Sequence, residues 1–96
     1  MYKDLDPLLH SQLRLAIVSL LISSDEVDFN HIKDITNATS GNISVQIKKL
    51  HDAGYIEVVR SFKNNYQNTS LKITINGIKA FEDYVESLKQ YIKTDK

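Results

Sequence analysis

The side chains best suited to chemistry lie close together between positions 40 and 49. This stretch carries hydroxyl and amide groups, which donate and accept hydrogen bonds, and two adjacent ammonium groups, which attract anions. The set is Ser40, Gly41, Asn42, Ser44, Val45, Lys48 and Lys49. Lysine can meet phosphates or guanine edges, serine and asparagine can bond bases or backbone, and valine can contact a thymine methyl group. These residue types fit the major groove of a nucleic-acid duplex.

Other chemistries find little support in the sequence. The histidines His10, His31 and His51 lie 21 and 20 residues apart, and the chain has no cysteine. This spacing is unlike that of zinc ligands, and a thiolate site or a thiol nucleophile is excluded. The glycines are isolated, so no phosphate-binding loop is present, and no acid and base are paired. We therefore expect no enzyme activity, no metal and no cofactor.

The net charge argues at first against a polyanionic partner, because 12 basic residues balance 12 acidic ones among 96 residues. The charges are nevertheless separated along the chain. Residues 1–39 carry three basic and six acidic residues, whereas residues 40–75 carry five basic and two acidic residues. A charge of −3 is thus followed by a charge of +3. Such asymmetry favours a basic surface that faces a polyanion.

Length and composition are those of one ordinary globular domain over residues 1–96, with 42% hydrophobic and 25% charged residues. The most apolar run, residues 15–22, has eight residues, whereas a membrane helix needs about 20. The N-terminal stretch is acidic and shows no targeting signal. We expect a cytoplasmic protein with no membrane partner.

Four helices and one hairpin are expected to position these residues. Asp6 and Pro7 predict the start of a helix over about 7–23, since aspartate caps helices and proline suits their first position. This helix is apolar nearly all round, so we expect part of it to meet a second subunit. A short helix over about 29–36, with Asp28 as a possible cap, follows a polar turn over residues 23–28.

The third helix is predicted over about 40–53 and ends at Gly54, which tolerates the left-handed backbone after a helix. Ile43, Ile47 and Leu50 form its inward face. On a helical wheel, the polar set of residues 40–49 then lies on the opposite, outward face.

Two strand-like runs after this helix predict a β-hairpin over about 55–75, with a polar tip over residues 63–69. Lys63, Asn64 and Asn65 in this tip can reach a minor groove or the phosphate backbone.

The last helix is predicted over about 76–93, with Thr74 or Asn76 as its cap. Its apolar residues are spaced by three and four, which is typical of a helix that packs along another helix. They are Ile78, Phe81, Val85, Leu88 and Ile92. The partner helix is either the first helix of the same chain or a second copy, and both contacts can coexist.

The resulting order, α-α-α-β-β-α, makes a mainly α fold with a β-hairpin, a winged helix-turn-helix with a long C-terminal helix. Three segments then show a family resemblance. They are the run from Thr39 to Ile56, the pattern Ile73-Thr74-x-x-Gly77-x-x-Ala80-Phe81, and the stretch from Leu5 to Ile17. Over about residues 5–92 the chain resembles the small winged-helix transcriptional regulators of bacteria and archaea that are related to the MarR, ArsR and PadR groups.

The resemblance implies a homodimeric DNA-binding regulator that pairs through its first and last helices. The implied dimer residues are Leu13, Ile17, Leu21, Phe81, Val85, Leu88 and Ile92. The set of residues 40–49 listed above would enter the major groove. The hairpin tip departs from the family pattern, because relatives often carry two or three arginines there, whereas this chain has the run from Lys63 to Asn68. Relatives can also bind small effectors between the dimer helices and the DNA-binding lobe; Tyr84 and Tyr91 could line such a space, but core packing explains them equally well.

The sequence therefore predicts a sequence-specific transcriptional regulator that binds an imperfect palindrome in double-stranded DNA as a homodimer. The alternative is a winged-helix module for protein–protein interaction that does not bind DNA. The plain hairpin and the zero net charge favour this alternative, whereas the Lys48-Lys49 pair does not.

Overall fold

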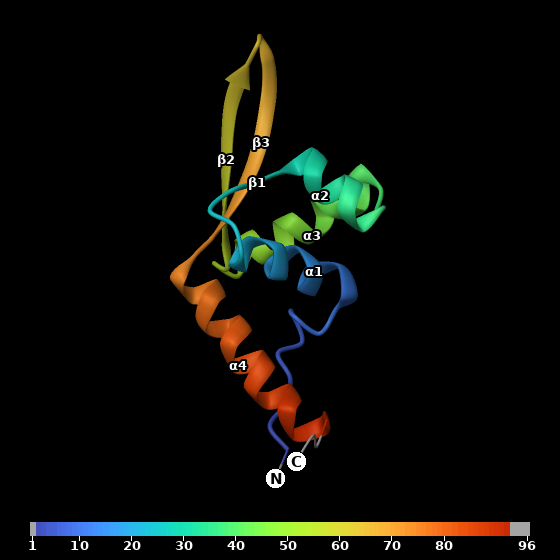
Figure 1. The fold of residues 1–96 in the computed structure, drawn as a ribbon, viewed down its shortest axis with the longest axis vertical. Coiled ribbons are helices and arrows are strands. Elements are labelled where there is room, and N and C mark those ends of the chain that lie inside the picture. Colours follow the sequence, from blue (N-terminus) through green and yellow to red (C-terminus); the bar gives the residue numbers. More distant parts are fainter. Residues whose placement is uncertain (1, 93–96) are drawn as a thin grey trace.

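Four helices and a three-stranded sheet form an elongated molecule in the computed structural model, which describes residues 2–92 except the side chain of Lys63 (Figure 1). The elements in chain order are α1 (Gln12–Ile22), β1 (Val27–Asp28), α2 (Phe29–Thr36), α3 (Ser40–Asp52), β2 (Ile56–Lys63), β3 (Tyr66–Ile73) and α4 (Ile75–Ile92). This is the expected winged helix-turn-helix with a long C-terminal helix, to which the structure adds the short strand β1. No helix in the described part of the chain combines the length and apolarity that crossing a membrane requires.

The antiparallel sheet has the strand order β1-β3-β2, and the long strands β2 and β3 form the wing. Val27 of β1 pairs with Leu71, so β1 covers the base of β3 only. The far half of the wing stands clear of the helices, and α4 extends at the opposite end of the molecule (Figure 1). The longest extent is 53 Å, against 26 and 23 Å for the other two.

One core of mostly aliphatic side chains joins α1, α2, α3 and the base of the sheet. Helix α3 buries the three residues expected to face inward, Ile43, Ile47 and Leu50. The other fully buried large side chains are Leu9, Ile17, Val18, Leu21, Ile32 and Leu71. Burial of an aliphatic side chain stabilises the fold by about 1.5–3 kcal/mol. The outward face of α3 is therefore held in place by the core beneath it.

The first helix begins at Gln12, and the predicted start at Asp6 and Pro7 is wrong. The side-chain carboxylate of Asp6 accepts a hydrogen bond from Leu8 N. The backbone carbonyl of Asp6 accepts from His10 N at 2.9 Å, and this second bond closes a turn that is separate from α1. Ser11 then adopts extended backbone angles and caps α1 by accepting from Arg14 N. Two good capping residues follow one another here, and the sequence pattern does not distinguish a capped turn from a capped helix.

The hairpin also differs from expectation, because its tip has two residues instead of the polar stretch over 63–69. Asn64 and Asn65 have φ angles of 52° and 67°, and the strands pair up to Lys63 and Tyr66. Two consecutive left-handed residues are typical of the tight type I′ turn, and asparagine tolerates them. No core lies beneath the outer part of β3, and the run from Gln67 to Ser70 is polar on both faces, so it lacks the alternation that marks a strand. The strand β1 was missed within the expected polar turn because two residues show no periodicity.

Helices α3 and α4 meet at a tightly bonded corner. Gly54 has a φ of +80°, which glycine adopts without strain, and Tyr55 N donates to Leu50 O in the hydrogen-bond pattern that ends many helices. Thr74 Oγ1 donates to Gly54 O at 2.6 Å and accepts from Gly77 N at 3.0 Å, so Thr74 caps α4. The same hydroxyl therefore bonds the end of α3 to the beginning of α4.

Helix α4 is lined on one side by the N-terminal segment. Tyr91 Oη donates to Lys3 O at 2.9 Å, and the rings of Tyr2 and Tyr91 lie 4.8 Å apart. Tyr84 is buried, and its hydroxyl forms a hydrogen bond with His10 Nδ1 at 3.0 Å. The helix is described as far as Ile92, so position 93 of the predicted helix lies outside the described residues.

Candidate nucleic-acid interface

The outward face of α3 presents every residue of the predicted set over 40–49 to solvent. Thr39 caps the helix by accepting from Asn42 N at 3.1 Å, so the first turn is fixed in place. The exposed residues are Ser40, Gly41, Asn42, Ser44, Val45, Lys48 and Lys49. A Cβ at Gly41 would meet no protein atom within 4 Å. The fold itself therefore does not require glycine at position 41, whereas a ligand approaching the helix backbone would benefit from it.

The Asn42 side chain is oriented by a chain of hydrogen bonds from α1. Arg14 donates from Nε to Leu8 O at 2.6 Å and from Nη1 to Gln46 Oε1, and Gln46 Nε2 in turn donates to Asn42 Oδ1 at 2.8 Å. The carbonyl oxygen of Asn42 thus accepts one hydrogen bond, and within residues 2–92 no hydrogen bond engages its NH₂ group, which can donate to a ligand. Purine N7, guanine O6 and thymine O4 are the acceptors that a major groove offers to such a donor.

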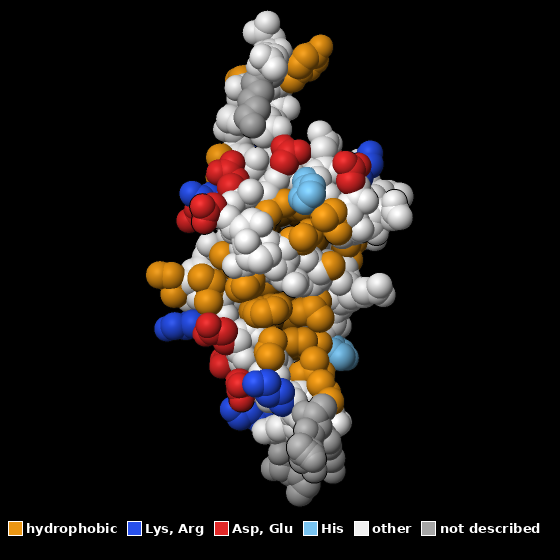
Figure 2. All heavy atoms as spheres, viewed as in Figure 1, with side chains coloured by type: hydrophobic (Ala, Val, Ile, Leu, Met, Phe, Trp, Pro, Cys, Tyr) orange, Lys and Arg blue, Asp and Glu red, His pale blue; other side chains and the backbone are white. Residues whose placement is uncertain are grey.

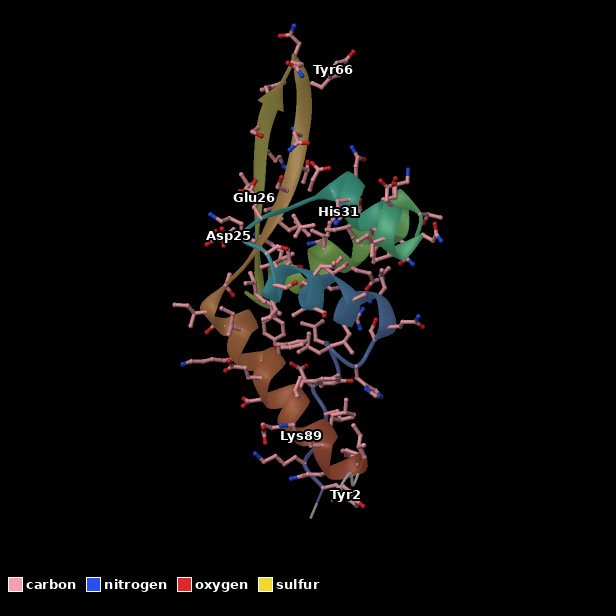
Figure 3. The ribbon with its side chains drawn as sticks, viewed as in Figure 1. Tyr2, Asp25, Glu26, His31, Tyr66 and Lys89 are labelled. Atoms are coloured by element: carbon pink, nitrogen blue, oxygen red, sulfur yellow. The ribbon has the colours of Figure 1, made fainter. Side chains whose placement is uncertain are left out.

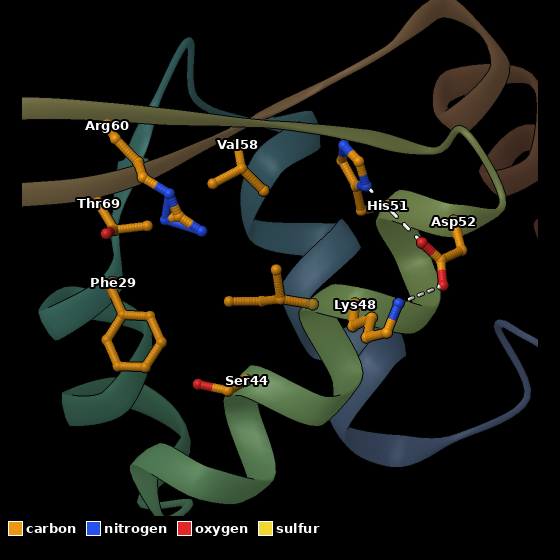
Figure 4. A pocket seen from close by; sticks show the side chains of 9 residues that line it. Phe29, Ser44, Lys48, His51, Asp52, Val58, Arg60 and Thr69 are labelled. Carbon is orange, nitrogen blue, oxygen red and sulfur yellow. Dashed lines mark hydrogen bonds and ion pairs between the residues drawn. The ribbon is translucent and has the colours of Figure 1, made fainter.

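A cleft of about 650 Å³ separates α3 from the wing (Figure 4). Ser44 and Lys48 line it from α3, and Arg60 and Thr69 line it from the paired strands β2 and β3. Phe29 of α2 closes one end. Within residues 2–92, no acceptor is hydrogen-bonded or ion-paired to the exposed Arg60 guanidinium. The cleft therefore brings Lys48 of α3 and Arg60 of β2 together beside the outward face of α3.

One carboxylate interrupts this basic surface. Asp52 Oδ2 accepts from Lys48 Nζ at 3.0 Å, and Asp52 Oδ1 lies 3.8 Å from His51 Nδ1 (Figure 4). The hydrogen bond from Lys48 holds the pKa of the Asp52 carboxyl below its usual value. Both partners are exposed, so the pair is weak and an incoming phosphate can compete with Asp52 for Lys48.

Arg60 is the residue of this surface that sequence reasoning missed. The expected nucleic-acid contacts of the wing were assigned to the tip, at Lys63, Asn64 and Asn65. Asn64 and Asn65 are exposed at the turn, and the Lys63 side chain lies outside the described part. Arg60 shares the period-two face of β2 with Ile56 and Val58. Arg60 occupies a position of this alternation where an apolar residue is expected. This could have indicated from the sequence that the wing directs a cation toward α3.

The predicted dimer residues divide into two groups. Ile17 and Leu21 are 0% exposed in the chain's own core, so they have no surface to offer a second copy. Leu13 is partly exposed but lines a surface hollow together with Ile35 and Asn42, on the side of α2 and α3. The assignment of Ile17 and Leu21 is therefore corrected. A helix that is apolar all round has no polar face that would mark its buried side.

The α4 residues of that prediction keep an accessible apolar surface. Phe81, Val85 and Leu88 are partly exposed, and Ile92 is 54% exposed. Figure 2 shows hydrophobic side chains gathered in a band over α1 and α4 on the viewed face. Tyr84, by contrast, points into the core and does not belong to this band.

A second hollow of about 410 Å³ lies between the N-terminal segment and α4, with Asp4, Asp6 and Asp83 among its lining residues. Tyr55 Oη donates to Asp6 Oδ2 at 2.6 Å. Burial, and then this bond to a carboxylate, raise the pKa of Tyr55 to about 12. Over residues 2–92, no group of three or more histidine, aspartate or glutamate side chains is arranged to hold a metal ion. Asp6 serves here to tie the N-terminal segment to the corner.

Comparisons with known proteins agree with this geometry. Residues 13–92 match the model of a family described as a winged helix DNA-binding domain. An uncharacterized protein of Methanocaldococcus jannaschii is 33% identical over 84 residues, which cover 88% of this chain and 91% of that protein. An uncharacterized HTH-type transcriptional regulator of Pyrococcus furiosus is 35% identical over 81 residues, and the chain spans 54% of its length.

Solved structures share the fold. A transcriptional regulator homologue from Pyrococcus horikoshii superimposes with a TM-score of 0.82 at 25% identity, over 88% of this chain and 84% of that one. A mutant of MarR from E. coli, crystallised with operator DNA, gives a TM-score of 0.71 at 16% identity. It covers 90% of this chain, which in turn spans 61% of the MarR chain. At this identity the MarR likeness concerns the fold alone.

Proposed function

Because this chain belongs to the family of winged helix DNA-binding domains, we propose that it is a transcriptional regulator that binds specific sequences of double-stranded DNA as a homodimer. Helix α3 enters the major groove, and the wing lies along the flanking backbone and minor groove. Residues 1–96 act as one DNA-binding domain.

The observation that carries this proposal is the continuity of two surfaces. The outward face of α3 bears hydrogen-bond donors and lysines, and it borders the cleft into which Arg60 reaches from the wing. Base edges are read by hydrogen bonds and apolar contacts, whereas phosphates are held by cations. Both kinds of group stand here side by side on rigid elements.

The side chains divide by role. Asn42, Ser44 and Val45 face outward near the start of α3, where recognition helices contact base edges. Lys49 and Arg60 hold phosphates on either side of that contact. Lys48 joins them once a phosphate displaces Asp52.

The dimer forms through the apolar band on α4. Phe81, Val85 and Leu88 form its centre, and Ile92 extends it toward the chain end. Two recognition helices related by a two-fold axis read half-sites one helical turn apart, about 34–36 Å, so the operator is an imperfect palindrome.

Selection of bound sequences from a random duplex pool tests the proposal as a whole. We expect enrichment of a two-fold symmetric motif, and binding that weakens steeply as salt rises because phosphate contacts release counterions. Failure to retain any duplex at low salt would overturn the proposal. A motif without symmetry would contradict the dimer but leave DNA binding intact.

Two variants of the full chain test the division of roles. Asn42→Ala removes a proposed base contact and should change the preferred base at one position of each half-site. Lys49→Ala removes a proposed phosphate contact and should weaken all sequences alike. Identical base preferences and identical affinity losses in the two variants would contradict these roles.

The protein-interaction module remains the second candidate, and the Lys48–Asp52 ion pair favours it, because this pair neutralises one cation of the recognition face. The random-pool experiment separates the two functions. A module of this kind retains no duplex at any salt concentration, and a stable protein partner then protects α3 from hydrogen exchange.

A further inference from the structure

The wing ends in two large aromatic side chains that the fold does not use. Phe62 and Tyr66 are 76% and 77% exposed, although aromatic side chains are usually covered in folded proteins. From Ser70 toward the tip, over residues 66–69 of β3, the two wing strands pair only with each other. Figure 3 shows Tyr66 at the end of the hairpin, clear of the helices. The tip therefore carries apolar surface to a place where only a partner can bury it.

The position of Phe62 relates this surface to the candidate interface. Side chains alternate along a strand, so Val58, Arg60 and Phe62 of β2 share one face, and Val58 and Arg60 line the cleft beside α3. Two strand residues span about 7 Å. Phe62 thus lies one step beyond the proposed phosphate contact of Arg60, on the side of the wing that faces the DNA.

The chemistry of the turn points in the same direction. Asn64 and Asn65 form a tight two-residue turn, so the tip is narrow, and neighbouring Gln67 adds a third exposed amide. Amide NH₂ groups match the adenine N3 and thymine O2 acceptors of the minor groove. A protein that lacks arginines at its tip can still hold this groove, because apolar side chains insert between base steps there and kink the duplex.

We propose that the wing tip of this chain grips the minor groove by apolar contact, with Phe62 as a wedge at a base step. Tyr66 pairs with Lys63 and so lies on the opposite face of the ribbon, where it packs against the facing sugar-phosphate wall. This inference rests on the proposed DNA-binding function. It deepens that function in one respect: the wing supplies shape recognition and bending instead of charge. Pyrimidine–purine steps unstack most easily, so the flanks of the operator should favour such a step where Phe62 enters.

The test uses the full chain and the duplex motif selected from the random pool. Phe62→Ala should weaken binding by about fivefold to tenfold, reduce the bend measured by fluorescence energy transfer between the duplex ends, and abolish the preference for a flanking TA step. The slope of log affinity against log salt should stay unchanged, because no phosphate contact is lost. Phe62→Leu keeps an apolar wedge and should retain most of the bend.

Ile75→Ala is the matched control, since Ile75 is 72% exposed and lies at the start of α4, away from the wing tip. It should leave affinity, bend and salt slope as they are. The inference is overturned if Phe62→Ala binds and bends the motif like the unchanged protein, or if it alters only the sedimentation of the free protein, which would make the tip a contact between copies. Loss of all duplex binding in the unchanged chain would instead refute the proposed function.

Discussion

Helices α3 and α4 meet at the same corner, yet their outward faces have opposite chemistry. Helix α3 buries its isoleucines and leucine and exposes hydroxyl, amide and ammonium groups, with Val45 as the exception. Helix α4 buries Gly77, Tyr84 and Ser87 and leaves larger aliphatic side chains partly in water. The outward face of α3 is polar and well solvated, and it suits a charged partner. The outward face of α4 leaves apolar surface in water, which is the surface that the proposed dimer would cover.

The largest effect is expected from breaking the corner that both helices share. In Gly77→Ala the new Cβ would lie 2.2 Å from Tyr55 O and 2.9 Å from Ile73 Cγ1, so α4 must shift away from the backbone. We expect the free energy of unfolding in urea to fall by about 3 kcal/mol. Gly41→Ala is the control, since its Cβ meets nothing within 4 Å, and it should not destabilise the fold. Equal losses in both variants would mean that the corner is not tightly packed.

The next effect separates the two helices. Val85→Asp places a carboxylate in the apolar band of α4 and should raise the dissociation constant of the dimer at least about a hundredfold, close to 3 kcal/mol. Sedimentation equilibrium measures this change. Lys89→Ala alters an exposed residue that pairs with Glu86 and should leave the dimer intact. If both variants dimerise as the unchanged chain does, α4 is not the interface.

A smaller effect concerns the cation beside α3. Arg60→Ala should reduce affinity for the selected duplex by about fivefold to tenfold and lower the steepness of the salt dependence by about one phosphate contact. Lys72→Ala removes the same charge from the opposite face of the wing. It should change the salt slope far less. Fluorescence anisotropy at several salt concentrations distinguishes the two, and similar slopes would remove Arg60 from the interface.

The smallest effect comes from the carboxylate that interrupts the basic face. Asp52→Asn frees Lys48 and should strengthen duplex binding about threefold at neutral pH. Lys48 lowers the Asp52 pKa, so the stabilising contribution of the pair is present above the ordinary carboxyl range and is lost only as pH falls through the lowered value. In Lys48→Met the Asp52 pKa should rise toward its usual value, as followed by NMR. An unchanged Asp52 titration would show that the pair does not persist in solution.

Elements that pack on the core were predictable, because their pattern records which side is buried. Helix α2 has the predicted bounds, α3 ends within one residue of its predicted end, and its inward face was identified from Ile43, Ile47 and Leu50. The end of α3 near Gly54 and the capping of α4 by Thr74 were also predictable from the sequence, since both depend on local backbone hydrogen bonding and conformation. The same wheel correctly assigned the outward residues of α3 to solvent.

Features that depend on distant contacts escaped prediction. The pattern of α1, which is apolar nearly all round, did not reveal that Ile17 and Leu21 face the chain's own core. The outer part of β3 has no core beneath it, so residues 66–69 were predicted as part of the hairpin tip instead of the strand. The network from Arg14 through Gln46 to Asn42 joins residues up to 32 positions apart, and local patterns do not show such bonds.

The hydroxyl of Thr74 has a mechanical consequence. It bonds Gly54, the glycine just after α3, to the first turn of α4, so it fixes the angle at which α4 leaves this corner. In a dimer joined through α4, each α3 helix would then be held at a fixed angle to the two-fold axis. A small change in the angle between the two α4 helices would produce a larger displacement of the α3 helices, because α3 lies far from the α4 contact. The distance between the two α3 helices, and hence the spacing of the half-sites that they can contact together, would thereby depend on how the two α4 helices pack.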